Sequence, residues 1–165
     1  MKKSVLLVVV AVVVGLGIWG WRVWFPTPQN VIRSRLLKLA STMSFEPHQG
    51  IIPKGLKAKN LGEYLTVDVV VNLEARGLEA HTLRGREEVV QAAMLAMQRL
   101  AGLKLEFVDI NVTLDAGGET AEASLTGKAT IEGESDYQVQ EFNFKLKKIE
   151  GIWLVYQVET VKTLG

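Results

Sequence analysis

The sequence predicts an α+β protein in which a single N-terminal transmembrane helix precedes a curved, mixed or antiparallel β-sheet wrapped around three helices as a cone. Three observations predict this fold class. A long apolar run opens the chain, apolar residues then recur at spacings of three and four, and from Leu103 onwards they alternate with polar residues. The alternation also changes phase twice, which predicts two β-bulges that bend the sheet.

The opening apolar run, residues 4–25, is long enough to cross a bilayer once. As a helix it would be about 33 Å long, which matches a hydrocarbon core of about 30 Å. A cleaved signal peptide is the alternative, but bulky residues such as Trp19 and Trp21 stand where small residues would mark a cleavage site. We therefore expect a retained signal anchor at residues 1–25 and one folded domain at residues 26–165.

The orientation of this anchor depends on the charges that flank it. Two lysines precede the run and several basic residues follow it, so the count of positive charges alone does not decide the orientation. A short basic head before a long apolar run is typical of an uncleaved signal anchor. We therefore expect a single-pass protein of the bacterial inner membrane, with its C-terminal domain in the periplasm.

Composition narrows the chemistry of the domain. The chain contains no cysteine, which excludes disulfides, thiol catalysis and zinc–thiolate sites. The formal net charge is +1 and no concentrated basic stretch is present, so nucleic acid is not an expected partner. A G-x-G-x-x-G pattern at residues 15–20 lies inside the apolar run and follows no strand, so it does not indicate a nucleotide site. We expect no metal and no cofactor, because no cluster has ligands at a recognisable spacing.

Three helices are expected in the domain. The first begins at Pro28 and has a single apolar stripe. Proline and glycine indicate a loop over residues 46–59, and residues 56–64 read as a short second helix. The acidic turn after Gly85 begins the third helix, because negative charge suits the positive end of a helix dipole. Gly102 ends it.

Six strands are expected to form the sheet. Residues 66–74 and 78–83 make a hairpin, and four long strands follow after Gly102, separated by turns rich in glycine. A change of phase at Val108 and Asp109 predicts a bulge in the third strand. A second change of phase before Phe142 predicts another bulge in the fifth strand.

Two short motifs accompany this order of elements. Residues 83–89, Leu-Arg-Gly-Arg-Glu-Glu-Val, lead into the third helix, and residues 151–155, Gly-Ile-Trp-Leu-Val, open the last strand. With the order of elements, they make residues 28–163 resemble the nuclear transport factor 2-like superfamily. That superfamily includes ketosteroid isomerases, polyketide cyclases, dehydratases, transport factors and membrane-anchored assembly proteins. The resemblance therefore predicts a fold and leaves the function open.

The resemblance also implies where catalytic residues would lie. Isomerases of the superfamily use a carboxylate near the end of the first long strand together with a tyrosine on the first helix, and dehydratase-like members pair histidine with aspartate. The first helix here has no tyrosine, so the isomerase dyad is absent. We expect no catalytic residue, because each remaining candidate is also explained as a solvated surface group. These weak candidates are Asp68, Asp109, Glu74 and His81.

Apolar side chains at the expected mouth of the cone allow two interpretations. They either fill the core or line a pocket for a small, flat or acyl ligand. Their regular spacing favours the core. They are Tyr64, Met94, Met97, Phe107, Tyr137, Phe142, Phe144 and Tyr156.

The outer face of the sheet is the expected interface. If Leu154 packs inside the cone, Trp153 and Val155 on the same strand face outwards, and an exposed tryptophan is a good interface anchor. Gln138 and Gln140 would lie on this face.

The sequence thus predicts a membrane-anchored, non-catalytic binding or assembly domain. Residues 4–25 would contact the bilayer, and the domain would form a homodimer or dock onto a larger membrane complex. The alternative is an isomerase-, cyclase- or dehydratase-like enzyme, or a carrier, with a small apolar ligand in the cone.

Overall fold

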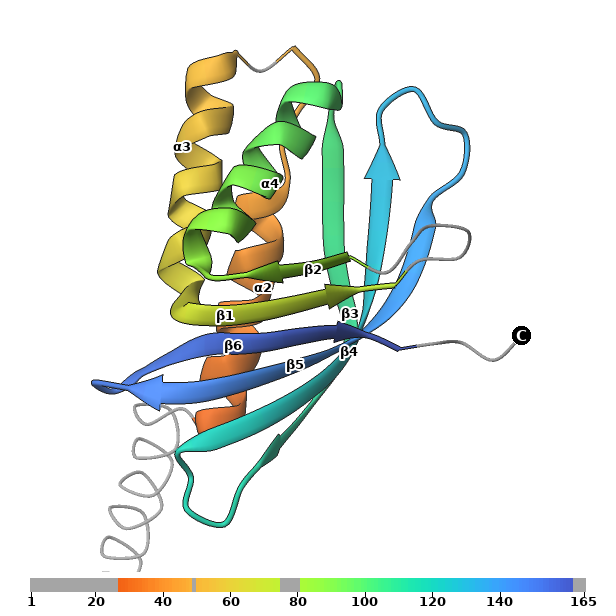
Figure 1. Ribbon diagram of the computed structural model, residues 1–165. Helices are drawn as coiled ribbons and strands as arrows, with labels where there is room; N and C mark the ends of the chain where they lie inside the picture. Colours follow the sequence, from red (N-terminus) through yellow and green to blue (C-terminus); the bar gives the residue numbers. More distant parts are fainter. Residues whose placement is uncertain (1–26, 49, 75–80, 162–165) are drawn as a thin grey trace, which may run out of the picture. The chain divides into compact units, whose positions relative to one another are not determined.

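The computed structural model describes residues 27–48, 50–74 and 81–161 (Figure 1). The expected membrane span therefore lies outside the described residues. Within the described ranges, no helix is long and apolar enough to cross a membrane. The chain divides into two compact units, Met1–Val31 and Ile32–Gly165, and the sheet and its core belong to the second.

Among the described residues, the helices are α2 (Pro28–Met43), α3 (Ile51–Leu61) and α4 (Arg86–Arg99), with a 3-10 turn, η1 (Gly62–Tyr64), after α3. The starts of the first and third helices are confirmed. The expected loop over residues 46–59 is too long, and the second helix, expected at residues 56–64, starts earlier, because α3 already begins at Ile51. Pro53 indicated a loop, yet it lies in the first turn of α3, where a missing backbone N–H breaks no helical hydrogen bond.

Six strands form one mixed sheet in the order β2-β1-β6-β5-β4-β3. The pairing of β1 with β6 is parallel, and all other neighbours are antiparallel. The bounds are β1 Leu65–Leu73, β2 His81–Arg84, β3 Leu103–Leu114, β4 Thr120–Ile131, β5 Gln138–Ile149 and β6 Ile152–Thr160.

One predicted bulge is confirmed and the other is misplaced. In β3 the register shifts after Val108, where Asp109 has a positive φ of 53°. In contrast, β5 pairs with β4 in unbroken register. The shift occurs in β6 instead, where Tyr156 is the extra residue. The exposed Val139 had suggested a change of phase in β5 that does not exist.

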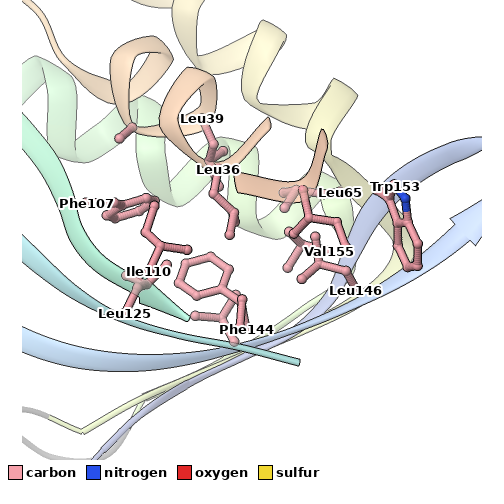
Figure 2. Packing of buried hydrophobic residues seen from close by; sticks show 14 of the residues in the cluster. Leu36, Leu39, Leu65, Phe107, Ile110, Leu125, Phe144, Leu146, Trp153 and Val155 are labelled. Carbon is pink, nitrogen blue, oxygen red and sulfur yellow. The ribbon is translucent and has the colours of Figure 1, made fainter. Parts of the chain in front are cut away.

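The core lies between the helices and one face of the sheet (Figure 2). Aromatic rings occupy its centre: Phe144 meets Phe107 edge to face at 5.6 Å and Phe142 at 6.1 Å between ring centroids. One continuous apolar cluster joins side chains of α2, β1, β3, β4, β5 and β6. This cluster holds the curved sheet onto α2.

The segment after α2 covers the first half of the free edge of β3. Phe45 and Leu103 exchange two backbone hydrogen bonds of 2.8 and 3.0 Å. The Ser44 hydroxyl accepts from the Leu105 N–H at 2.9 Å and donates to the Leu105 carbonyl at 3.2 Å. Further along the strand, the Arg33 guanidinium donates to the carbonyl of Ile110.

Candidate functional site

The residues expected at the mouth of the cone divide into three groups. Met97, Phe107 and Phe144 are buried. Tyr64, Met94 and Phe142 are half-buried and pack against the buried clusters. The remaining two lie elsewhere, because Tyr137 is exposed and Tyr156 sits beside Lys147, whose Nζ is 5.7 Å from the ring centroid. Six of the eight residues thus belong to the packing of the interior.

The interior is almost entirely apolar. Among the described residues, Thr66 has the only buried polar side chain. No described acid, base or imidazole is buried in the core, so its side chains offer no group that could transfer a proton to an enclosed substrate.

The expected interface anchor is wrong. Trp153 is only 3% exposed and Val155 only 2%, and both point into the core (Figure 2). The bulge at Tyr156 explains the error: it puts Val155 and Val158 on the same face although they are three residues apart. Counting back from Val158 in strict alternation, without the extra residue, therefore placed Trp153 and Val155 on the outer face.

The expectation that Gln138 and Gln140 lie on the outer face is also wrong. They pair with Ala129 and Gly127, on the face of β4 that carries the buried Leu125, so they lie on the core side of β5. Gln138 is exposed, whereas Gln140 is half-buried. The Gln140 amide donates to the carbonyls of Glu141 and Val161, both at 3.0 Å, so it fastens β5 to the end of β6.

Apolar side chains do gather on the outer face of the sheet, at a different place. Val108 and Val139 are exposed on β3 and β5, and their register opposite Thr126 and Lys128 puts them on the face away from the core. Tyr137 is also exposed, and the Lys128 ammonium lies 4.2 Å from its ring centroid. We call Val108, Tyr137 and Val139 the outer-face patch.

Asp68 and Asp109 lie on β1 and β3, which are separated in the sheet by three strands. Asp68 is exposed on β1 and forms an ion pair of 3.4 Å with Lys147. The neighbouring Thr66 hydroxyl, then the Asp68 backbone N–H and Lys147, hold the pKa of Asp68 below its ordinary value. Asp109 is exposed in the bulge of β3. Neither carboxylate is placed as a general base in an enclosed site.

The structure does bring two weak candidates together. Glu74 and His81 line an open pocket of about 310 Å³ at the end of β1, β2 and β6. The other lining residues are Asn72, Leu73, Thr82, Glu159 and Thr160.

Hydrogen bonds order the walls of this pocket. The Thr82 hydroxyl donates to Asn72 Oδ1 at 3.0 Å, and the Glu74 N–H donates to the Thr160 hydroxyl at 2.8 Å. Two carboxylates and an imidazole give the pocket the chemistry to bind a small, polar, hydrogen-bonding molecule. In the part of the chain that the structure describes, no group of three or more acidic or histidine side chains is placed to hold a metal ion.

Sequence reasoning missed the contribution of β6 to this pocket. Glu159 lies beside Asn72 because β1 and β6 pair in parallel. Such a pairing joins residues far apart in the chain, and no local pattern of hydrophobic residues specifies it. The only local indication of this pocket in the sequence was the predicted hairpin, which brings Glu74 and His81 near each other.

Solved structures share this architecture. A nuclear transport factor 2-like protein of unknown function from Pseudomonas putida superposes with a TM-score of 0.64 at 11% identity, covering 83% of this chain and 87% of the other. A nuclear transport factor 2-like protein with a cystatin-like fold from Novosphingobium aromaticivorans gives 0.60 at 16% identity, with 81% and 82% covered. An uncharacterised protein with a cystatin-like fold from Caulobacter vibrioides gives 0.60 at 16% identity, with 81% and 89% covered.

The amino-acid sequence of the chain has only low identity to the sequences of these proteins. It matches no protein-family model and no curated protein sequence. Identities this low establish a shared fold and nothing further. The chain has the nuclear transport factor 2-like, or cystatin-like, fold.

Proposed function

We propose that the chain is a membrane-anchored, non-catalytic binding or assembly domain that forms a homodimer or docks onto a larger membrane complex. The observation that carries this proposal is the composition of the core, in which Thr66 is the only buried polar side chain among the described residues. An enzyme of this fold class would need at least one acid or base held beside an enclosed substrate. The anchor is the apolar run at residues 4–25, and the domain would lie in the periplasm.

The outer-face patch is the best candidate for the assembly surface. It presents two exposed valines on β3 and β5, the strands that flank β4, and a tyrosine just before β5 whose ring lies under the Lys128 ammonium. Aromatic residues beside exposed aliphatic side chains are typical of interface centres. Because Trp153 is buried, we assign its expected role at the interface to this patch instead.

The test measures the mass of the full-length protein in detergent by light scattering, together with chemical cross-linking in the membrane before extraction. Val139→Glu places a charge in the outer-face patch and should abolish the dimer or the cross-linked complex. Ile149→Glu is the matched control, since it lies on the same face of β5 at the other end of the strand and is also exposed. Circular dichroism should be unchanged in both variants.

Two results would contradict the proposal. One is a monomer without any cross-linked partner. The other is a dimer or complex that Val139→Glu leaves intact while Ile149→Glu disrupts it, which would move the interface to the opposite end of β5.

A small-molecule carrier or enzyme is the second candidate, and the pocket lined by Glu74, His81 and Glu159 is the observation that favours it. Native mass spectrometry of the purified protein would then detect a retained small molecule. His81→Ala and Glu159→Gln should release it, whereas Glu134→Gln, an exposed carboxylate outside the pocket, should not. Retention of the molecule by both pocket variants would exclude this pocket.

A further inference from the structure

The first two turns of α3 expose large aliphatic side chains. Ile51 is 76% exposed, Ile52 is 87% exposed and Leu56 is 58% exposed. Single exposed aliphatic residues are common on protein surfaces, but neighbouring ones on one helix are unusual. We call Ile51, Ile52 and Leu56 the α3 patch.

The geometry of α3 makes this patch continuous. Ile52, Leu56 and Lys59 follow the i, i+4, i+7 spacing, so they form one stripe on the exposed side of the helix. Gly55 adds no side chain, and a Cβ there would meet nothing within 4 Å, so the surface around it is open. On the other side, Ala58 and Leu61 are buried and fix α3 against the rest of the unit.

The charge around the α3 patch is positive. α3 itself carries three basic side chains, Lys54, Lys57 and Lys59, and no acidic one.

These cations are not neutralised by carboxylates. Lys54 and Lys57 donate to the backbone carbonyls of Leu100 and Ser44. Neither of the ion pairs formed among the described residues involves α2 or α3. A carbonyl holds a lysine in place but leaves its net charge uncompensated, so this region attracts anions.

We propose that the α3 patch docks onto an anionic lipid bilayer. Apolar side chains next to lysines on an exposed helix combine the two forces that hold a protein at a membrane interface, namely burial of apolar area and attraction to anionic headgroups. The inference rests on the proposed membrane anchor, because the anchor would keep the domain at a high effective concentration beside the lipid surface.

Charge complementarity favours lipid over a second copy of the chain. A symmetric dimer through the α3 patch would place the same basic helix on both sides of the interface. The like charges would repel each other, whereas an anionic surface would attract the lysines of α3.

The absence of cysteine allows a direct test with the full-length protein. A single cysteine at position 52, introduced by Ile52→Cys, is labelled with an environment-sensitive fluorophore. The protein is then reconstituted into phosphatidylcholine vesicles that contain one third phosphatidylglycerol, with or without a lipid-borne quencher. Val67→Cys is the matched control, because Val67 is an aliphatic residue of β1 that is 73% exposed and belongs to neither patch. Val12→Cys reports on the anchor.

The expected result is a blue-shifted emission at position 52 that the lipid quencher reduces, with little quenching at position 67. Adding Lys59→Glu, or replacing phosphatidylglycerol by phosphatidylcholine, should reduce the quenching at position 52. If the probe at position 12 is quenched but the probe at position 52 is not, the docking proposal fails and the anchor stands. A blue shift at position 52 without lipid quenching also overturns it, because another protein surface then covers the patch. If the probe at position 12 is not quenched, both proposals fail.

Discussion

Gly127 on β4 shows how a single residue shapes the core, because the ring of Phe142 lies directly against its Cα. A Cβ at this position would stand 2.7 Å from Phe142 Cε2. Gly127→Ala should therefore push the ring away from Phe144 and destabilise the fold. Overpacking costs about 1 to 3 kcal/mol and relief of glycine's backbone entropy returns about 0.5 to 1 kcal/mol, so the net loss of stability should lie between about 0 and 2.5 kcal/mol, centred near 1 kcal/mol.

Urea unfolding measures this loss, and Gly55→Ala provides the opposite control. Gly55 lies inside α3 with open space around it. Alanine there should raise the free energy of unfolding by about 0.5 to 1 kcal/mol. Equal effects of the two substitutions would contradict the close contact at Gly127.

Trp153 provides a second prediction at the residue scale. Trp153→Ala removes a large side chain from the core and should cost about 3 to 5 kcal/mol of stability. Leu154→Ala, on the half-exposed side of the same strand, should cost clearly less. Chemical denaturation of both variants checks this, and an unaffected Trp153→Ala variant would place the side chain outside the core. The sequence could not assign its face, because the one-residue bulge at Tyr156 leaves no mark in the hydrophobic pattern.

Among the elements, the hairpin of β3 and β4 depends on Asp115. Its carboxylate accepts hydrogen bonds from the N–H groups of Thr120 at 2.9 Å and Glu119 at 3.0 Å. The Thr120 N–H is the largest cause that lowers the pKa of Asp115 below its ordinary value. The carboxylate therefore stabilises the fold above its unfolded pKa of about 3.9, and this contribution is lost as the pH falls through the lower pKa of the folded state.

An NMR titration of the Asp115 side chain should show this lowered pKa directly. Asp115→Asn should flatten the acid limb of the stability curve and leave stability near neutral pH lower than that of the wild type. A titration midpoint at or above the ordinary aspartate value would refute the assigned role of the two N–H groups.

Elements with local signals were predictable, and elements defined by distant partners were not. Three features were predictable because the residues that signal each of them are close together in the sequence. They are the apolar stripe of α2, the acidic first turn of α4 and the glycine turns between the last strands. The parallel contact of β1 with β6 instead joins Asn72 to Glu159. For this reason the sequence indicated Glu74 and His81 singly, while the pocket that unites them became visible only in the folded sheet.

For the whole molecule, the continuous core predicts cooperative unfolding of the second unit. The apolar cluster joins α2 with five of the six strands, so no large part can separate without exposing the rest. Trp153 is the only tryptophan after residue 24. In a variant with Trp19, Trp21 and Trp24 changed to phenylalanine, fluorescence and circular dichroism should therefore report the same denaturant midpoint. Separate midpoints would indicate that α2 and the sheet unfold independently.

If the proposed anchor holds the chain at a membrane, the covered edge of β3 has a consequence for crowding there. Proteins confined to a surface meet often, and an open strand edge would invite a neighbour to extend the sheet by backbone pairing. Here Phe45, Ser44 and Arg33 already occupy backbone groups along that edge. A neighbouring molecule that meets this edge would therefore contact side chains. Such contacts can separate again without breaking a paired strand.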